Sequence, residues 1–137
     1  MDLYIVRNNI MKGVPLQELN LRVCFYARVS TDKDEQLHSL QSQISFFNDY
    51  TSKVPNWEFI GSYIDEGISG TQVKKREEFL RMIEDAKRHK FDLILTKEIS
   101  RFSRSTLDSI KYTQELLSNG VGVYFLNDNI NTILPDS

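Results

Sequence analysis

Residues 24–31 read CFYARVST, and the pattern of this stretch determines how the chain is expected to fold. In an extended strand, successive side chains point to opposite faces. The polar stripe on one face ends in Arg28 and Ser30, whereas the other face is wholly apolar: Val23, Phe25, Ala27 and Val29. This pattern predicts a core strand that delivers an arginine and a serine to one edge of a sheet.

Outward from this stretch, extended and helical patterns alternate along the chain. Further strands are predicted at 57–64, 91–96, 121–126 and, as a short piece, 130–133, with helices at 36–52, 76–89 and 105–118. The alternation predicts an α/β fold: a three-layer, mostly parallel but mixed sheet of four to five strands flanked by helices, of the flavodoxin-like type. In detail, Asp34 is expected to cap the first helix, and Leu80 to face inward from the second.

Length and composition favour one soluble domain. The 137 residues leave room for one core, and the division expected is an N-terminal extension over residues 1–20 followed by a domain over residues 21–137. Neither a membrane-spanning stretch nor a signal peptide is recognisable, and the single cysteine excludes an internal disulfide. These features favour a cytoplasmic protein with no metal site built on cysteines.

The candidate chemistry lies where the parallel strands end. Ligands bind at the carboxyl ends of strands in open parallel sheets. Three polar segments leave those ends, and they contribute the side chains Arg28 and Ser30, then Asp65 and Arg76, then Lys97, Arg101 and Arg104. Guanidinium groups match phosphate oxygens, and a serine hydroxyl can attack phosphorus. A P-loop and a two-metal carboxylate cluster are both absent from the sequence, so no cofactor and no metal is expected.

Plainer interpretations stand beside this one. Ser30 could be a turn residue, Arg28 could pair with a buried carboxylate such as Asp65, and the arginines near residue 101 could form an ordinary basic helix start. The net charge of −2 argues against an isolated nucleic-acid-binding domain. It leaves room for local basic clusters, of which Lys74 and Lys75 form one and Lys97 begins another.

Four motifs in order favour the phosphate chemistry over the plainer interpretations: YARVST, SLQSQ, DEGISGT followed by KKREEFLRMIEDAK, and SRFSRST. Together they resemble the serine recombinase family of resolvases and invertases, and most of all the catalytic domain of its large transposon and phage integrase branch. The resemblance covers about residues 21–134. It implies a resolvase-like fold and a serine recombinase catalytic domain over residues 21–137.

The resemblance implies a mechanism as well. Ser30 would attack a phosphodiester of double-stranded DNA and form a 5′-phosphoserine link, which keeps the energy of the broken bond so that strands can be rejoined without ATP or metal. Dimers and a synaptic tetramer would carry out the exchange in the full-length protein. The protein would be encoded by a bacterium, a phage or another mobile element.

Site residues carry over position by position. Arg28 matches the arginine beside the nucleophile, and Arg101 and Arg104 match the pair that binds and activates the scissile phosphate. Arg76 matches a further catalytic arginine of the active site. The supporting positions are Tyr26, Gln43, Asp65 and Ser100, and the basic residues expected to contact DNA are Lys74, Lys75 and Lys97. Small resolvases have an aspartate where this chain has Ser100, so the general acid and base for Ser30 stay unassigned.

The resemblance also implies parts that this sequence does not contain. Family members continue into a long helix and DNA-binding domains, so the 137-residue chain alone is expected to bind DNA weakly and not to complete recombination. Two rival interpretations are a non-catalytic DNA-binding or assembly module derived from a recombinase, and a flavodoxin-like phosphate-binding protein or phosphate-ester hydrolase. The intact serine and arginines disfavour the first, and the order of the motifs disfavours the second.

Overall fold

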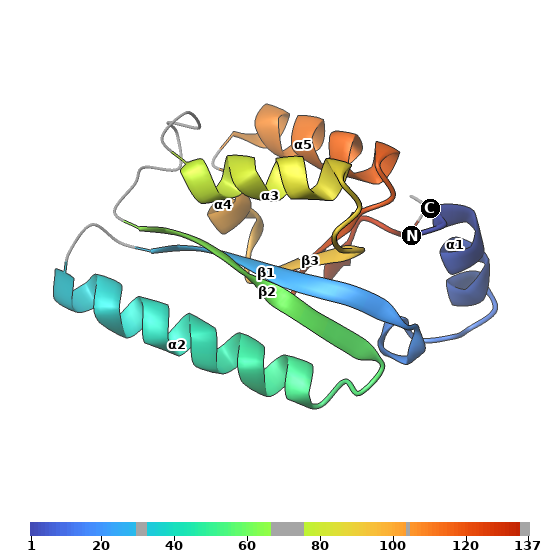
Figure 1. The fold of residues 1–137 in the computed structure, drawn as a ribbon, viewed down its shortest axis with the longest axis horizontal. Coiled ribbons are helices and arrows are strands. Elements are labelled where there is room, and N and C mark those ends of the chain that lie inside the picture. Colours follow the sequence, from blue (N-terminus) through green and yellow to red (C-terminus); the bar gives the residue numbers. More distant parts are fainter. Residues whose placement is uncertain (30–32, 67–75, 104, 135–137) are drawn as a thin grey trace.

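The computed structural model describes residues 1–29, 33–66, 76–103 and 105–134, with side chains described throughout except at 33–39 and 100. A strand-and-helix alternation follows two short N-terminal elements (Figure 1). The elements in chain order are α1 (Leu3–Met11), the 3-10 turn η1 (Leu16–Glu18), β1 (Leu21–Val29), α2 (Lys33–Ser52), β2 (Trp57–Glu66), α3 (Glu77–Lys87), β3 (Leu93–Thr96), α4 (Ile99–Phe102), α5 (Thr106–Ser118), β4 (Gly122–Phe125) and β5 (Ile130–Asn131).

The sheet confirms the predicted α/β architecture. Its strands lie in the order β2-β1-β3-β4-β5; the first four are parallel, and β5 runs antiparallel to β4. In Figure 1, α2 lies on one side of the sheet, while α3, α4 and α5 lie on the other. Because β1 sits between two parallel neighbours and under helices on both sides, Val23–Val29 are all buried.

The two faces of β1 build two separate cores. Odd-numbered residues such as Phe25 join the cluster under α2, where the Phe25 and Phe47 rings stack 4.5 Å apart. Even-numbered residues such as Tyr26 join the cluster under α3 and α5, where Phe79 meets the edge of the Tyr26 ring at 5.3 Å. The polar stripe of β1 therefore faces the α3–α5 side, and its last members point toward the carboxyl ends of the strands.

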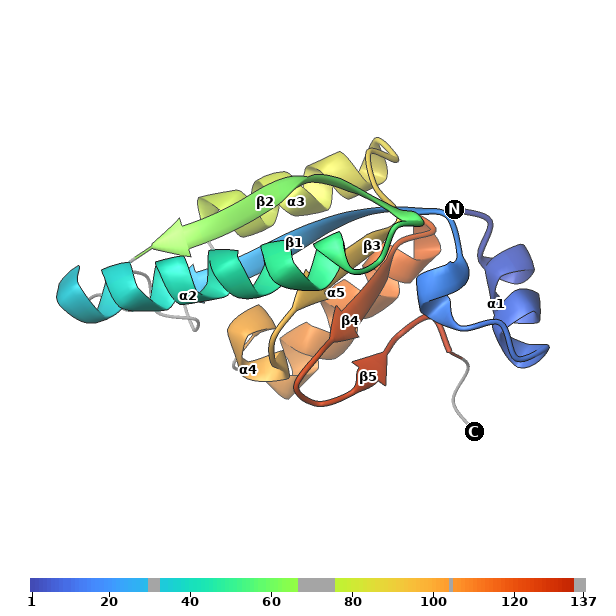
Figure 2. The same cartoon turned by 90° about the horizontal axis from the view of Figure 1, so that it is seen from below.

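Residues 1–20 form α1 and η1, which pack against the opposite, amino-terminal end of the sheet (Figure 2). Val6 and Leu16 are buried in the same cluster as Phe25. This segment, which we call the N-terminal segment (residues 1–20), is therefore a folded part of the domain. The sequence predicted an extension here but no helix.

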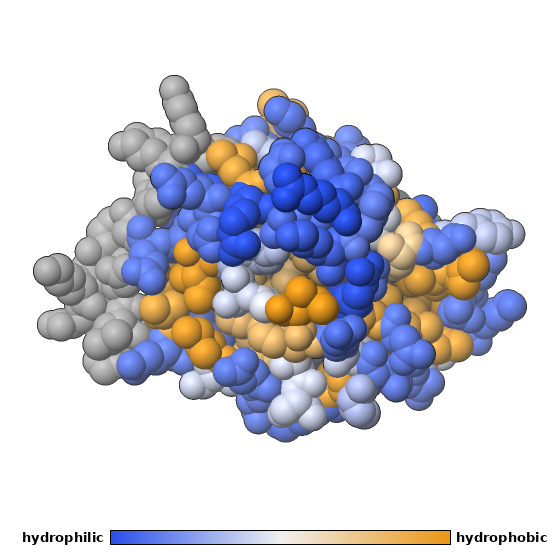
Figure 3. All heavy atoms as spheres, in the orientation of Figure 1, coloured by the Kyte–Doolittle hydropathy of each residue, from blue (hydrophilic) through white to orange (hydrophobic). Residues whose placement is uncertain are grey.

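The edge strand β2 carries a β-bulge. Phe59 pairs with Val23 and Gly61 pairs with Cys24, so Ile60 is the extra residue. Phe59 and Ile60 are both exposed, and Figure 3 shows an apolar patch over β2 between more polar helices. A bulge interrupts the regular row of backbone donors and acceptors, which makes the edge a poorer template for pairing with another strand.

Several details differ from the sequence-based predictions. The helix predicted at 36–52 is α2, which begins at Lys33, so Asp34 lies inside its first turn and is not the cap. The short helix α4 was not predicted, because four residues are too few for a periodic pattern. Leu80 was predicted to face inward, but it is exposed on the outer side of α3. No helix in the described part of the chain has the length and apolar character to cross a membrane.

An ion pair joins the first strand to the start of the third. Asp92 accepts hydrogen bonds from the backbone N–H of Arg22 at 2.9 Å and from the Arg22 guanidinium at 3.1 and 3.3 Å. Burial alone would raise the pKa of Asp92, but the hydrogen bonds from Arg22, together with the ammonium of Met1 at 3.1 Å, outweigh it and hold the pKa below its ordinary value. Ionised Asp92 therefore stabilises the fold.

We predict that this contribution is lost in acid. A carboxyl group whose pKa is lowered by folding stabilises the native state above its unfolded pKa, about 3.9, and loses that stabilisation as the pH falls through the lower folded value. In urea unfolding between about pH 5 and pH 2, Asp92→Asn should lower stability at pH 5 and flatten the acid dependence. Asp49→Asn, on the exposed surface of α2, is the matched control. Equal acid slopes in Asp92→Asn and the parent would contradict the prediction.

Candidate active site

The carboxyl ends of β1 and β2 bring two predicted site residues together. Arg28 is buried, with 7% of its surface exposed, and lies opposite Asp65 in the parallel register. The Arg101 guanidinium on α4 reaches across to β1, where its Nη1 donates to the Arg28 carbonyl oxygen at 3.2 Å. This hydrogen bond connects the end of β1 to α4 at Arg28, two residues before Ser30 in the chain.

The helix α4 is held at both ends although it has one turn only. At its start, the Ile99 N–H donates to Asp128 Oδ2 at 3.0 Å, a side chain that follows β4 in the chain. At its end, the buried Phe102 ring packs at a steep angle against the rings of Phe79 and Phe125, with ring centres 5.1 Å and 5.6 Å apart. A short helix gains little stability from its own hydrogen bonds, so these contacts determine where Arg101 lies.

Asp65 is the centre of a buried polar network. Its Oδ2 accepts from the Tyr26 hydroxyl at 2.7 Å and from the Phe79 N–H at 3.1 Å, and its Oδ1 accepts from the Glu78 N–H at 3.0 Å. The two N–H groups belong to the first turn of α3, which has no side-chain cap of its own at Arg76. A carboxylate at a helix start satisfies free N–H groups and interacts favourably with the helix dipole. Asp65 therefore fixes α3 to the end of β2.

Arg76 extends the network to α4. The residue is fully buried; its Nε donates to the Tyr26 hydroxyl at 3.1 Å, and its Nη2 donates to the carbonyl oxygen of Phe102. Its guanidinium carbon lies 4.0 Å from the centre of the Phe79 ring, which is a cation–π geometry. Arg76 Nη1 is also buried and has no hydrogen-bond partner within the described ranges.

The hydroxyl of Tyr26 lies between a carboxylate and a guanidinium. It donates to Asp65 and accepts from Arg76, so the two buried charges are connected through one neutral group. Burial raises the pKa of Tyr26 well above its ordinary value, against the opposing effect of the nearby Arg76 charge. Tyr26 therefore keeps its proton, and with it the donor that Asp65 needs.

Two predicted residues lie on the α2 side of the sheet. Gln43 is buried with 3% of its surface exposed, one turn before Phe47 on the inner face of α2. Lys97 is partly exposed, and its ammonium lies 4.9 Å from the centre of the Phe46 ring on α2. The structure thus places Lys97 toward α2, on the other side of the sheet from Arg76.

Several predicted residues lie outside the described residues. These are Ser30, Arg104, Lys74 and Lys75, together with the side chain of Ser100. Arg101 lies on α4, and the next helix, α5, begins at Thr106 with Ser105 as its cap. Within the described ranges, no three His, Cys, Asp or Glu side chains gather as a metal site.

Sequence reasoning missed two parts of the site. The Phe102 carbonyl is a backbone group, and no residue type indicates that it accepts from Arg76. Asp128 caps α4 from 29 residues away along the chain, a contact that only the folded sheet creates. The one available signal was the run Asn-Asp-Asn at residues 127–129, which is typical of a turn but does not indicate which group Asp128 contacts.

Comparisons with known proteins find similar sequences and similar folds. The sequence model of the family described as "Resolvase, N terminal domain" matches residues 23–136. A "Resolvase/recombinase" of Pseudomonas putida is 34% identical over 112 residues, and the "Transposon Tn3 resolvase" of Escherichia coli is 31% identical over 112 residues. Each alignment covers 82% of this chain, and 55% and 54% of the respective relative.

Among solved structures, the N-terminal catalytic domain of TP901-1 integrase is similar, with a TM-score of 0.72 and 29% identity. The match covers 81% of this chain and 82% of that domain. The chain spans about half the length of the curated relatives it matches.

We predict that Tyr26→Phe destabilises the domain by about 1–3 kcal/mol, because it leaves an oxygen of Asp65 and the Nε of Arg76 buried with one partner fewer. The free energy of unfolding from urea titration measures this loss. Tyr4→Phe is the matched control, since Tyr4 lies on α1 with 75% of its surface exposed, and its effect should stay within about 0.5 kcal/mol. Equal losses in the two variants would contradict the assigned network.

Proposed function

The chain belongs to the resolvase family, as the catalytic domain of a serine site-specific recombinase, and we propose that it cuts and rejoins double-stranded DNA through Ser30. The observation that carries this proposal is the junction of Arg101 with the backbone of Arg28, at the edge from which the chain continues to Ser30. A serine hydroxyl beside guanidinium groups is suited to attack on a phosphodiester.

In the proposed step, Ser30 Oγ forms a bond to phosphorus while the bond from phosphorus to the 3′-oxygen breaks. The products are a 5′-phosphoserine and a 3′-hydroxyl, so one proton leaves the serine and one joins the departing oxygen. Negative charge grows on the non-bridging oxygens in the transition state. Arg28, Arg101 and Arg104 are proposed to stabilise that charge, and removing one such donor typically costs about 3–4 kcal/mol in other enzymes.

Arg76, Tyr26 and Asp65 act in this proposal as positioning residues. A fully buried guanidinium that is already bound to a tyrosine hydroxyl and a carbonyl oxygen is poorly placed to contact DNA. Its carbonyl partner, Phe102, lies between Arg101 and Arg104 in the chain. Arg76 therefore supports the phosphate-binding segment from within, while Gln43 is proposed to support the site from α2 and Ser100 from α4.

The remaining proposals concern the wider reaction. Lys74, Lys75 and Lys97 are proposed to contact the DNA backbone outside the scissile phosphate. The domain of residues 21–137 is proposed to work within a longer protein, because the alignment covers only 55% of the Pseudomonas putida relative. That longer protein is proposed to form dimers and a synaptic tetramer. Because those relatives come from bacteria, we expect the substrate to be bacterial or mobile-element DNA in the cytoplasm.

The test is a covalent adduct between protein and DNA. Full-length protein is incubated with nicked duplexes from the DNA that flanks its own gene, digested with protease and nuclease, and analysed by mass spectrometry. We expect a nucleotide linked to Ser30 through phosphate in the parent, complete loss of the adduct in Ser30→Ala, and retention in Ser52→Ala, an exposed serine at the end of α2.

The same experiment separates the rival function. If the parent binds these duplexes but forms no adduct, the chain is a non-catalytic DNA-binding or assembly module, and the proposed reaction is wrong. An adduct that persists in Ser30→Ala would show that another residue is the nucleophile.

A further inference from the structure

The N-terminal segment lies outside the part of the chain that the family shares. The match to the family begins at residue 23, so α1 and η1 are additional to the common domain. Val6 and Leu16 are nevertheless buried, with 9% and 8% of their surfaces exposed, in the cluster that contains Phe25. An added segment that contributes to the core has a defined position on the domain.

One end of this segment is attached where the described chain leaves the sheet. Arg7 Nε donates to the carbonyl oxygen of Ile133 at 2.7 Å, across 126 residues of sequence. Because β5 is antiparallel to β4, it runs back toward the amino-terminal end of the sheet, where α1 lies (Figure 2). Arg7 is thus bound to the last turn before residue 134, at the end of the sheet opposite the candidate active site.

The short strand β5 and the turn after it make several other contacts with the sheet. β5 has two residues, and its register pairs only Asn131 with Tyr124 and Ile130 with Phe125. Beyond β5, Thr132 N–H donates to the Val123 carbonyl oxygen at 3.0 Å, and Ile133 is fully buried. Arg7 adds a charged donor on the Ile133 carbonyl to these contacts, and it is the one that links this turn to α1.

The other end of the segment is attached to α2 and β2. Trp57 Nε1 donates to the Leu16 carbonyl oxygen at 3.2 Å, and Asn56 Nδ2 donates to the Glu18 carbonyl oxygen at 3.2 Å. Gln17 Nε2 donates to the hydroxyl of Tyr50 on α2 at 3.3 Å. The segment therefore spans the amino-terminal end of the sheet, from the edge strand β2 to the turn after β5.

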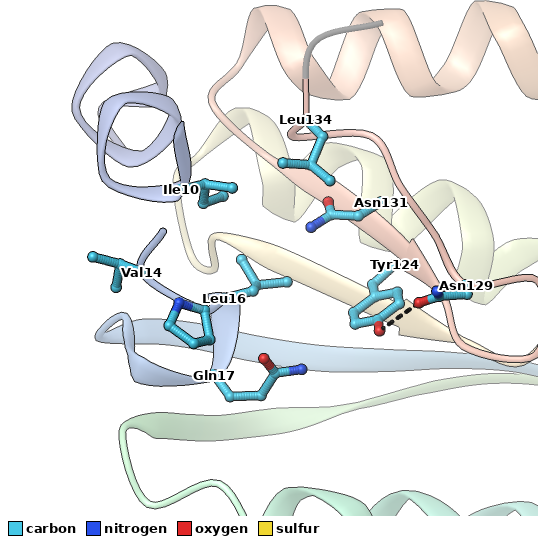
Figure 4. A pocket seen from close by; sticks show the side chains of 9 residues that line it. Ile10, Val14, Leu16, Gln17, Tyr124, Asn129, Asn131 and Leu134 are labelled. Carbon is cyan, nitrogen blue, oxygen red and sulfur yellow. Dashed lines mark hydrogen bonds between the residues drawn. The ribbon is translucent and has the colours of Figure 1, made fainter. Parts of the chain in front are cut away.

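Two hollows lie near these attachments. One of about 230 Å³ lies between the N-terminal segment and the end of β4 and β5, and a larger one of about 330 Å³ lies between α5 and the turn after β5, with Arg7 as its one lining residue from the segment. Figure 4 shows the smaller one, with Ile10, Val14, Leu16 and Gln17 on one side and Tyr124, Asn129, Asn131 and Leu134 on the other. The segment is therefore held by the packing of Val6 and Leu16 and by polar contacts at three points: the Met1 ammonium on Asp92, Arg7 on Ile133, and Trp57 on the Leu16 carbonyl.

We propose that residues 1–20 form a built-in clamp, which ties the turn after β5 to the β2 edge and so fixes the direction in which the chain leaves the domain at Leu134. The relatives extend well beyond the length that this chain matches. In a longer form of this protein, the clamp would couple whatever follows Leu134 to the orientation of the catalytic domain. This inference does not depend on the proposed DNA reaction.

The test places a nitroxide spin label at position 134 in Leu134→Cys and records its mobility by electron paramagnetic resonance. The native Cys24 is fully buried, and burial raises the pKa of its thiol well above the ordinary value, so it should not compete for the label. We expect an immobilised spectrum in the parent and at least a twofold larger mobile fraction in Arg7→Ala. Arg7→Lys, which keeps a charged donor, should recover part of the immobilised signal.

Tyr4→Ala is the matched control, because Tyr4 lies on the same helix with 75% of its surface exposed. Hydrogen exchange without the label gives a second readout: Arg7→Ala should accelerate exchange of the Thr132 amide about tenfold and leave the amides of β3 unchanged. The clamp is ruled out if Arg7→Ala leaves both readouts at the parent level. It is also ruled out if Tyr4→Ala mobilises the label equally, or if β3 exchanges faster by the same factor as Thr132.

Discussion

The buried guanidinium of Arg76 is the contact on which the arrangement of the site depends. Through Tyr26 it is linked to Asp65, and Asp65 in turn holds the first turn of α3. Through the Phe102 carbonyl it is linked to the end of α4. An isolated buried charge would be costly, so the carboxylate, the hydroxyl and the Phe79 ring are all required to keep the guanidinium inside. Two strands and two helices are thereby fixed to one another at the edge where Arg28 lies.

This edge explains how a chain with a net charge of −2 can hold the proposed phosphate-binding site. Arg28, Arg76 and Arg101 meet near the ends of the parallel strands, and the fold, not the overall composition, brings them together. Arg101 takes its place because α4 is held by Asp128 at one end and by Phe102 at the other. The amino-terminal end of the sheet carries no part of this site and is instead closed by the N-terminal segment. The proposed chemistry therefore lies at one end of the sheet, and Leu134, the last described residue, lies near the other end.

The sequence predicted those features that arise from local pattern. Alternation along residues 23–29 predicted a core strand with Arg28 on its polar face, and the order of strands and helices predicted the sheet. The burial of Arg76 could not be predicted, because an arginine that follows two lysines is typical of a solvated basic cluster. Only the folded chain brings Tyr26, Phe79 and Phe102 around its side chain. α4 was missed because its stability comes from distant contacts. The packing of Val6 and Leu16 was missed because it depends on a groove that exists only after the sheet forms.

The central claim is that Arg76 supports the phosphate-binding segment from within and does not bind phosphate itself. Nuclear magnetic resonance of the chain labelled with ¹⁵N-arginine tests this claim directly, because each arginine Nε–H gives its own signal. The account predicts that the Arg76 signal exchanges slowly with water and stays in place when short duplex DNA is added, while the signals of Arg28 and Arg101 move. An Arg76 signal that moves as far as that of Arg101, or that exchanges as fast as an exposed arginine, would contradict the account.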